Sequence, residues 1–345
     1  MKLKRYSGNP ILKPNPANAW EALVTTNPGA WYDPGTRKVT LLYRAAGNDA
    51  EHKIHFGLAE STDGYNFRRL SDQPVFSPSV DGFDAGCVED PRIIKIGEWY
   101  YVTYAARPFP PGQYWLDDGR PFKPPTMPPE APWILRANGT QTGLAMTRDF
   151  KTWIRAGRLT IPLMEDRDVI IFPEKINARW YMITRPSTGI HPRYQRDGAY
   201  AMWIGSSIDM LHYDAFDVLA GPRVEHDWES TKVGANGPPI KTDAGWVVIY
   251  HGVGKDKLYR LGALLLDLKD PTKVIGRTAD WLMQPEETYE TDGFYCGCVF
   301  PCGNVVIDGT LFVYYGGGDP LVGLAPPPPG AHPAAPQEPE PGPPA

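Results

Sequence analysis

The chain has 345 residues, of which 35 are Lys or Arg and 40 are Asp or Glu, and its formal net charge is −5. The two signs are interspersed and no basic run stands out, so we expect no nucleic-acid partner. No apolar segment has the length of a membrane span, and none follows the basic residues at the start of the chain. The sequence therefore predicts a cytoplasmic protein with no membrane partner.

The composition favours an all-β fold. Trp (11), Tyr (18), Gly (35) and Pro (38) are all plentiful. Short aromatic and β-branched runs are separated by Gly, Pro, Asp and Asn, which is typical of strands joined by many turns. The cysteines lack the paired spacing of a zinc module, so we predict neither a disulfide nor a structural metal. They are Cys87, Cys296, Cys298 and Cys302.

One type of strand recurs five times along the chain. Its copies are residues 40–44, 99–105, 180–185, 246–251 and 311–315. We take as equivalent the positions Tyr43, Tyr104, Thr184, Tyr250 and Tyr315. By subtraction, the successive spacings between them are 61, 80, 66 and 65 residues. A second strand type follows three copies and leads into a turn that contains Asp. A unit of about 60 to 65 residues repeated five times is typical of propeller blades rather than of a sandwich. We therefore predict a five-bladed β-propeller.

The repeat fills a single domain, residues 1–324. An insertion, residues 107–135, explains the long spacing and is rich in proline and aromatic residues. Its aromatic rings are candidates for stacking on a sugar or for contact with a neighbouring subunit in a homo-oligomer. Residues 325–345 are mostly Pro, Ala, Gly and Glu, and we expect a disordered tail. We also expect the N-terminal segment to help close the last blade.

The residue after the equivalent position is cationic or protonatable in three blades: Arg44 in the first, Arg185 in the third and His251 in the fourth. Equivalent positions of a propeller converge on one end of the central channel, so these side chains would face one pocket. Such a set suits a multiply charged anion, and the planar fork of Arg matches phosphate. The alternative is that each side chain is simply solvated or hydrogen-bonded and has no role in function. The repeat position that the three residues share is an argument for a function.

Two acidic motifs are further candidates. Glu89-Asp-Pro-Arg92 precedes a strand, and we expect it on a loop or at a strand start, where one carboxyl group would supply the proton that glycoside cleavage needs. Its alternative role is turn formation by Asp before Pro. Asp166-Arg-Asp168 precedes a buried-looking run, and its alternative role is a charged turn. Neither a nucleophile elbow, nor a phosphate loop, nor a His-Glu-x-x-His zinc motif occurs in the sequence.

As a set, the motifs resemble glycoside hydrolase family 130, which comprises β-mannoside phosphorylases and related β-mannosidases. The similarity extends over residues 9–319, and the number of the motifs and their order along the chain make chance agreement improbable. It rests on Asn27-Pro-Gly29, Tyr43-Arg-Ala45, Gly57-Leu-Ala59, Glu89-Asp-Pro-Arg92, Phe172-Pro-Glu-Lys175, Lys232-Val-Gly234, Pro238-Pro-Ile240, Tyr250-His-Gly252, Leu264-Leu-Leu-Asp267 and Tyr314-Tyr-Gly-Gly317. The family fold is a five-bladed propeller with its active site in the central channel, in agreement with the repeat.

The resemblance implies that Asp90 is the catalytic acid, which passes its proton through the mannose 3-hydroxyl to the glycosidic oxygen. The attacked sugar would be held by Asn27, Arg44, Asp90, Lys232 and Asp319. The phosphate would be held by Arg167, Arg185, His251 and Tyr259, with Asp168 beside them. The implied reaction is inverting phosphorolysis of a β-mannoside to α-mannose 1-phosphate, with inorganic phosphate as co-substrate and no cofactor. We expect a β-1,4-linked disaccharide or oligosaccharide, such as mannobiose or mannosyl-glucose, as substrate.

Two other functions stay open. A β-mannosidase of the same fold would need a basic carboxylate to activate water. Phosphate is already an anionic nucleophile and needs cations to orient it, so the basic residues favour phosphorolysis. The other alternative is a non-catalytic carbohydrate-binding propeller, and the place of Asp90 within a whole set of expected contacts argues against it.

Overall fold

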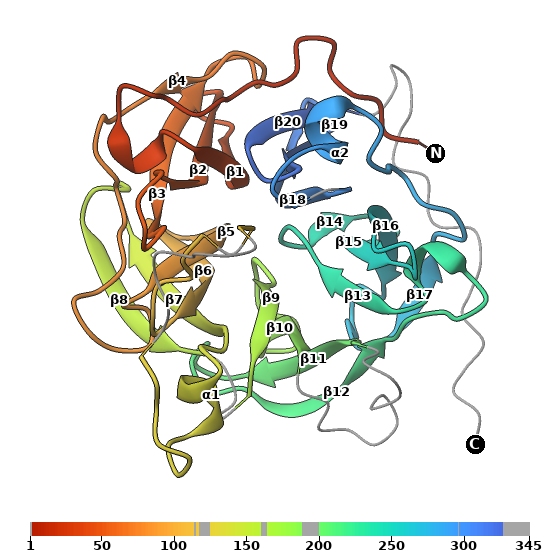
Figure 1. Cartoon of the computed structure of the whole chain (residues 1–345). Coiled ribbons are helices and arrows are strands. Elements are labelled where there is room, and N and C mark those ends of the chain that lie inside the picture. Colours follow the sequence, from red (N-terminus) through yellow and green to blue (C-terminus); the bar gives the residue numbers. More distant parts are fainter. Residues whose placement is uncertain are drawn as a thin grey trace.

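The computed structural model describes residues 2–113, 115–116, 125–159, 164–187, 200–295 and 297–326. It confirms the predicted five-bladed β-propeller, in which small antiparallel sheets surround a central channel (Figure 1). The tail predicted for residues 325–345 starts too early, because Ala325 is buried in the last strand; residues 327–345 lie outside the described residues. No described helix is both long enough and apolar enough to cross a membrane.

Each blade runs outward from the channel in strand order. The first strands line the channel and are β1 (Val24–Asp33), β5 (Cys87–Ile96), β9 (Asp166–Ile171), β13 (Lys232–Ala235) and β18 (Val299–Ile307). The second strands are β2 (Lys38–Ala46), β6 (Trp99–Arg107), β10 (Trp180–Pro186), β15 (Gly245–Val253) and β19 (Thr310–Gly317). The third strands are β3 (Ile54–Ser61), β7 (Gln141–Thr147), β11 (Met202–Ser207), β16 (Tyr259–Leu266) and β20 (Leu321–Ala325).

Fourth strands complete four of the blades. They are β4 (Arg68–Arg69), β8 (Trp153–Arg158), β12 (Asp214–Ala220) and β17 (Val274–Arg277), and blade 4 also carries β14 (Ile240–Thr242) beside β15. Within the described residues, the short helices between strands are η1 (Ala19–Glu21), α1 (Trp133–Arg136), η3 (Asp227–Glu229) and α2 (Thr288–Thr291). The five equivalent positions found in the sequence all fall on second strands, so the repeat in the sequence corresponds to the blades.

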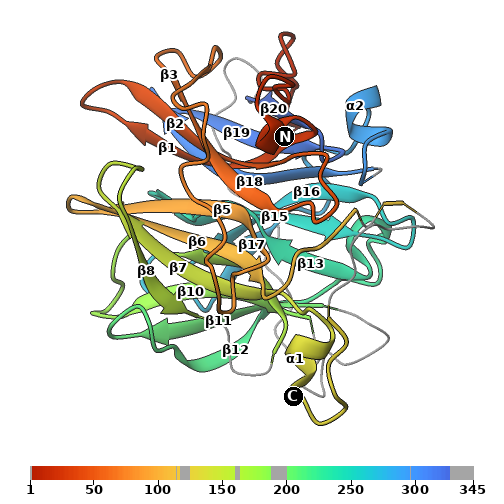
Figure 2. The same ribbon diagram turned by 60° about the vertical axis from the view of Figure 1, so that its left-hand side comes forward.

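The N-terminal segment takes the outer place in blade 5, as expected. Leu12 forms an antiparallel bridge with Val322 of β20, and the Tyr6 N–H donates to the Leu324 carbonyl at 2.9 Å. In the view of Figure 2 the N-terminal end lies beside β20. The two ends of the described chain therefore close the ring between blade 5 and blade 1 by backbone hydrogen bonds.

A recurring set of three side chains, which we call the blade clamp, crosses four blades. A second-strand Tyr packs over the Gly of the third strand and donates its hydroxyl to a carboxylate that precedes the first strand. An Arg from the fourth strand, or from the N-terminal segment in blade 5, binds the same carboxylate. The clamps are Tyr43–Glu21–Arg69, Tyr104–Asp84–Arg155, Tyr250–Glu229–Arg277 and Tyr315–Glu290–Arg5.

Blade 3 departs from this pattern. Thr184 replaces the tyrosine and donates its hydroxyl to Asp166, and Phe216 of β12 fills the space over Gly205. The Asp166 side chain is buried, and no arginine ion pair to it occurs among the described residues. Burial raises the pKa of Asp166 to about 6. The hydrogen bond from Thr184 lowers the pKa, but by less than burial raises it.

Bulges in three first strands shape the channel end. In β1, β5 and β9, two residues face one residue of the second strand, and Asn27, Asp90 and Asp168 occupy the bulges with φ of 42°, 54° and 59°. Bulges bend a strand and redirect its side chains, and they are common beside active sites. The expectation that Glu89-Asp-Pro-Arg92 lies on a loop or at a strand start is therefore wrong, because this motif and Asp166-Arg-Asp168 both lie within first strands.

The described part of the insertion packs against its own chain. The Trp115 ring lies 4.6 Å from the His52 ring and 4.7 Å from the Phe294 ring, measured between ring centres. Gln113 donates to the Asn48 side chain at 3.0 Å. Tyr114, one of the candidate aromatics, lies outside the described residues. The first part of the insertion thus fastens blade 2 to the edges of blades 1 and 5.

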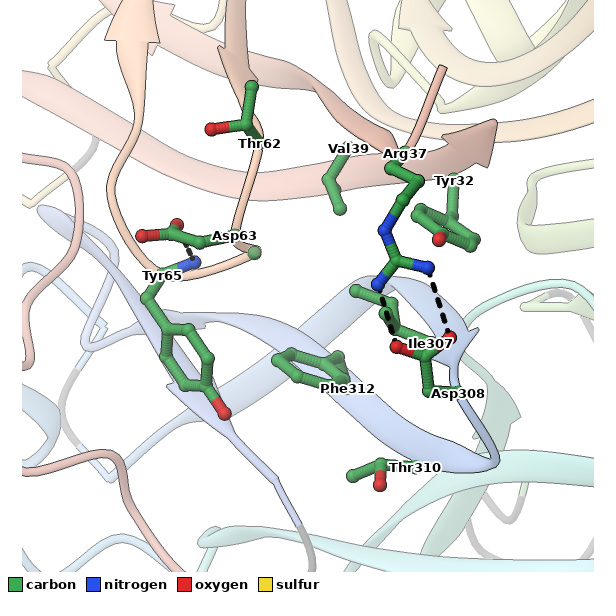
Figure 3. A pocket seen from close by; sticks show the side chains of 11 residues that line it. Tyr32, Arg37, Val39, Thr62, Asp63, Tyr65, Ile307, Asp308, Thr310 and Phe312 are labelled. Carbon is green, nitrogen blue, oxygen red and sulfur yellow. Dashed lines mark hydrogen bonds and ion pairs between the residues drawn. The ribbon is translucent and has the colours of Figure 1, made fainter. Parts of the chain in front are cut away.

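A cavity of about 290 Å³ lies at the far end of blades 1 and 5 (Figure 3). The Tyr65 and Phe312 rings meet there with centres 5.3 Å apart, and Arg37 forms an exposed ion pair with Asp308 at 2.7 Å. β1 runs from Asn27 at the bulge towards this cavity at its other end. The cavity contains none of the predicted site residues, and its rings belong to the packing between the two blades.

Candidate active site

Two overlapping cavities occupy the bulged end of the channel. The inner cavity has a volume of about 90 Å³ and the outer one about 670 Å³. All the residues predicted from the sequence line one or both of them. The inner cavity is lined by Asn27, Arg44, Asp90, Arg167, Asp168, Arg185, His251, Tyr259 and Asp319, and the outer cavity adds Lys232. The structure thus brings the predicted sugar and phosphate residues together, while their individual roles stay predictions.

Asp90 lies at the bulge of β5 and faces the inner cavity. Its Oδ1 accepts hydrogen bonds from Asn27 Nδ2 at 2.9 Å and from Arg44 Nη1 at 3.2 Å. Buried Arg92 donates from Nη1 to the Asp90 carbonyl at 2.9 Å and from Nε to the Asn236 carbonyl at 3.0 Å. These bonds hold the left-handed backbone of Asp90, so the carboxyl group has a fixed direction and its side chain is still 15% exposed to the cavity.

Asp168 anchors the cations on the opposite side. Arg185 Nε donates to Asp168 Oδ2 at 2.6 Å, and Arg92 Nη2 lies 3.4 Å from Asp168 Oδ1. Burial alone would raise the pKa of the Asp168 carboxyl, but the charges around it, that of Arg185 first, and the hydrogen bond from Arg185 together outweigh burial and hold the pKa well below its usual range. Asp168 therefore stays ionised and fixes the guanidinium of Arg185 in place.

His251 is fully buried beneath the inner cavity. Neither of its ring nitrogens makes a hydrogen bond within the described part of the protein, and Nε2 lies 3.7 Å from Asp168 Oδ2. The ring packs between Tyr259 and Phe300, and the absence of a side chain at Gly234 leaves room for it, because a Cβ there would lie 2.6 Å from His251 Cε1. Burial lowers the pKa of His251 to about 3, so the ring is neutral and offers one N–H donor.

Lys232 lines the outer cavity and contacts Tyr259, which lines both cavities. Its Nζ donates to the Tyr259 hydroxyl, which lies 3.2 Å from the Tyr295 hydroxyl. Burial, and then the Arg185 charge, lower the pKa of Lys232 to about 7. The cavity thus holds a cation whose charge depends on its surroundings near neutral pH. Among the described residues, no group of three or more His, Cys, Asp and Glu side chains has the arrangement of a metal site.

Several residues that line the cavities were not identified as site residues from the sequence. Glu89 pairs with Arg44 at 3.3 Å and with Arg107 at 3.5 Å, and although its burial acts in the opposite direction, these cations hold the pKa of Glu89 at about 2. Glu165 and Tyr295 line the outer cavity. Glu89 belongs to a motif singled out from the sequence, but Glu165 and Tyr295 have no repeat position, so no pattern in one sequence marks them.

Comparisons with known proteins identify the family of the chain. The family described as beta-1,4-mannooligosaccharide phosphorylase, glycoside hydrolase family 130, matches residues 2–116 and 136–328. The chain belongs to this family. The prediction of family 130 is therefore confirmed, and with it the classification as an enzyme of the mannoside phosphorylase type.

Individual relatives differ in the linkage that their names carry. The 1,2-beta-oligomannan phosphorylase of Thermoanaerobacter sp. (strain X514) is 38% identical, over 94% of this chain and 97% of its own. The beta-1,4-mannooligosaccharide phosphorylase of Ruminococcus albus is 28% identical, over 93% of this chain and 87% of its own. Among solved structures, the beta-1,2-mannobiose phosphorylase of Listeria innocua in complex with beta-1,2-mannobiose has a TM-score of 0.75 at 26% identity, covering 94% of this chain and 96% of that one.

Proposed function

We propose that the protein is an inverting β-mannoside phosphorylase that uses inorganic phosphate to release α-mannose 1-phosphate and an acceptor sugar. The observation that carries the proposal is the convergence of Arg167, Arg185 and buried His251 on the same small cavity as Asp90. A buried ring nitrogen without a partner is costly, and a phosphate oxygen would supply that partner. We propose no cofactor beyond phosphate, and the cytoplasmic location stays a prediction.

The state of the carboxylates supports phosphorolysis over hydrolysis. A hydrolytic enzyme of the inverting type needs a carboxylate that is basic enough to take a proton from water. Glu89 and Asp168 both face the inner cavity, and arginines hold the pKa of each below its usual range, so that both are weak bases. Phosphate needs no such base, because it arrives as an anion and is oriented by cations.

The position of Asp90 supports its role as the acid. The leaving oxygen needs a proton in the transition state, and a carboxyl whose pKa is strongly lowered cannot supply it at neutral pH. Glu89 and Asp168 are thereby excluded. Asp90 stands at the exposed face of the bulge with Oδ1 fixed by Asn27 and Arg44, which leaves the group aimed at the sugar subsite. A relay through the mannose 3-hydroxyl, as the family resemblance implies, is part of this proposal.

For the substrate we propose a β-1,2-linked oligomannoside in place of the β-1,4 linkage expected from the sequence. The support is the difference in similarity, since the 1,2-beta-oligomannan phosphorylase is 38% identical and the beta-1,4-mannooligosaccharide phosphorylase 28%. The acceptor would lie in the outer cavity, which the insertion borders through Pro111 and which Asn138 lines just after it.

The test is a substrate panel with and without phosphate, followed by assay of mannose 1-phosphate and free mannose. We expect mannose 1-phosphate only with phosphate, and faster turnover of β-1,2-mannobiose than of β-1,4-mannobiose or mannosyl-glucose. Free mannose without phosphate would favour a mannosidase, and binding without turnover would favour a lectin. A preference for β-1,4-mannobiose would overturn the linkage alone.

Replacing the acid gives a sharper test. We expect Asp90→Asn to lower kcat for β-1,2-mannobiose by about 10³-fold, because proton donation to the leaving group contributes about 10²- to 10⁴-fold. The matched control is Asp308→Asn, a substitution of the same kind in the exposed ion pair at the far cavity, which should leave kcat unchanged. Activity of Asp90→Asn within tenfold of the wild type would remove Asp90 from the role of acid.

A further inference from the structure

The cations of the cavity differ in how firmly they are held. Arg185 is bound to Asp168 at 2.6 Å, and both side chains are almost fully buried. Arg167 is bound to Glu165, with Nη2 3.1 Å from Oε1, at the mouth of the outer cavity, where the two side chains are 34% and 20% exposed. Solvent-screened pairs exchange partners readily, whereas buried pairs do not. Arg167 is therefore the arginine whose partner can change when a ligand binds.

Glu165 has its own supports at this mouth. Its Oε1 also lies 3.4 Å from the Thr140 backbone N–H, and its carbonyl accepts the Ser187 N–H at 2.9 Å. Burial would raise the pKa of Glu165, but the charge and hydrogen bond of Arg167 outweigh it and the pKa is lowered. The carboxylate is thus ionised at neutral pH and held beside the predicted phosphate site.

We propose that Glu165 acts as an internal counter-anion that competes with phosphate for Arg167 and thereby sets the phosphate affinity of the enzyme. In the free protein, Glu165 occupies a guanidinium edge that an oxyanion would otherwise bind. A phosphate that reaches Arg167 must share it with a carboxylate of the same sign, and that repulsion weakens binding. This inference rests on the proposed phosphorylase function and adds a residue that tunes its second substrate.

The two arginines then have different tasks. Arg185, fixed by Asp168, defines where the phosphate lies. Arg167 adds a positive charge to the phosphate site. While the site is empty, Glu165 balances this charge, so that no uncompensated guanidinium is left at the cavity mouth. Removing the Glu165 charge while keeping a hydrogen-bond acceptor should therefore leave Arg167 in place and strengthen phosphate binding.

The experiment compares Glu165→Gln with the wild-type chain by calorimetric titration with inorganic phosphate, and by the KM for phosphate in phosphorolysis. Glutamine keeps the side-chain oxygen that accepts from Arg167 and lacks the charge. We expect Kd and KM for phosphate to fall about five- to tenfold, the effect of one nearby charge at a partly solvated site. The KM for the mannoside should stay within twofold. Glu98→Gln, an exposed substitution with the same change in net charge, should change neither value.

Each outcome separates the possibilities. A Kd for phosphate that is unchanged or weaker in Glu165→Gln overturns the counter-anion role. Glu165→Ala, which also removes the hydrogen-bond acceptor, serves as the second variant. Tighter phosphate binding by Glu165→Gln than by Glu165→Ala supports the proposal that the Glu165 charge competes with phosphate while its side-chain oxygen holds Arg167 in place. A wild-type chain that binds no phosphate at all would instead contradict the proposed function, whatever the variants do.

Discussion

The blade clamps and the active-site cavity use similar charged side chains in opposite ways. In the clamp of blade 4, Glu229 accepts from Tyr250 at 2.6 Å and from Arg277 at 2.7 Å, and all of these groups are buried. In the cavity, the nitrogens of His251 have no hydrogen-bond partner within the described part of the chain, and burial lowers the pKa of Lys232 to about 7. Unpaired buried polar groups cost free energy. Pairing in the clamps thus supports the fold, and incomplete pairing in the cavity leaves groups that a ligand can satisfy.

Blade 3 lies between these two cases. It supplies Arg167, Asp168 and Arg185 to the cavity, and its own clamp is incomplete because Asp166 is bound by Thr184 and by no arginine side chain among the described residues. The fourth strand of this blade places Phe216 over Gly205, at the position where the other blades place their tyrosine. The blade that contributes both arginines proposed to bind phosphate is therefore the one with the weakest internal polar support.

The largest effect is expected from breaking a complete clamp. Glu229→Gln removes the charge that balances Arg277, whose side chain is 2% exposed. We expect the free energy of unfolding to fall by about 3 to 5 kcal/mol, the usual cost of leaving one partner of a buried ion pair uncompensated. Urea unfolding measures this loss, and kcat of the folded fraction should be unchanged because the clamp lies outside the cavity.

The control for this clamp is Glu286→Gln. Glu286 pairs with Arg5 at 2.8 Å but is 51% exposed, so its replacement should cost less than about 1 kcal/mol. A loss in Glu229→Gln as small as that of the control would mean that the clamp arginine finds other compensation, and the contrast between clamps and cavity would not hold.

The sequence predicts the blades and the gathering of Arg44, Arg185 and His251, because repeated strands carry position from blade to blade. It does not predict the bulges, since a bulge depends on which residues face each other across two strands. The contacts of Arg92 were missed for a related reason. Arg92 donates to the carbonyl of Asn236 in blade 4, and a contact between distant segments leaves no local pattern. Glu165 pairs with Arg167, two residues away, but neither position belongs to the repeat, so nothing in the sequence marks Glu165.

A middle-sized effect is expected from Asp166 of blade 3, whose carboxyl makes no ion pair among the described residues. Burial raises the pKa of Asp166 from an ordinary 3.8 to about 6 in the folded protein. Its contribution to stability is then complete below about pH 4 and is lost as the pH rises through about 6. Asp166→Asn keeps an oxygen for the Thr184 hydroxyl and never ionises, so we expect the variant to be about 1 to 3 kcal/mol more stable than the wild type at pH 8 and equal to it near pH 4.

The matched control is Asp84→Asn in the complete clamp of blade 2, where Arg155 and Tyr104 bind the carboxylate. This variant should be destabilised at pH 8 instead of stabilised. Unfolding curves at several pH values distinguish the two. Equal behaviour of the Asp166 and Asp84 variants would show that the missing arginine of blade 3 has no energetic consequence.

The smallest effect concerns the unbalanced cation of the cavity. Lys232 has a pKa of about 7 in the free protein because of its burial and of Arg185, so at pH 8 it is mostly neutral. A bound phosphate brings negative charge beside it and raises its pKa, and binding at pH 8 should therefore take up close to one proton, whereas binding at pH 6 should take up few. Calorimetric titration in two buffers of different ionisation enthalpy measures this number. The Lys232→Met variant should bind phosphate more weakly and should take up no proton on binding. If the variant takes up as many protons as the wild type, the proton goes to phosphate itself. Lys232 would then not be one of the groups that the ligand satisfies.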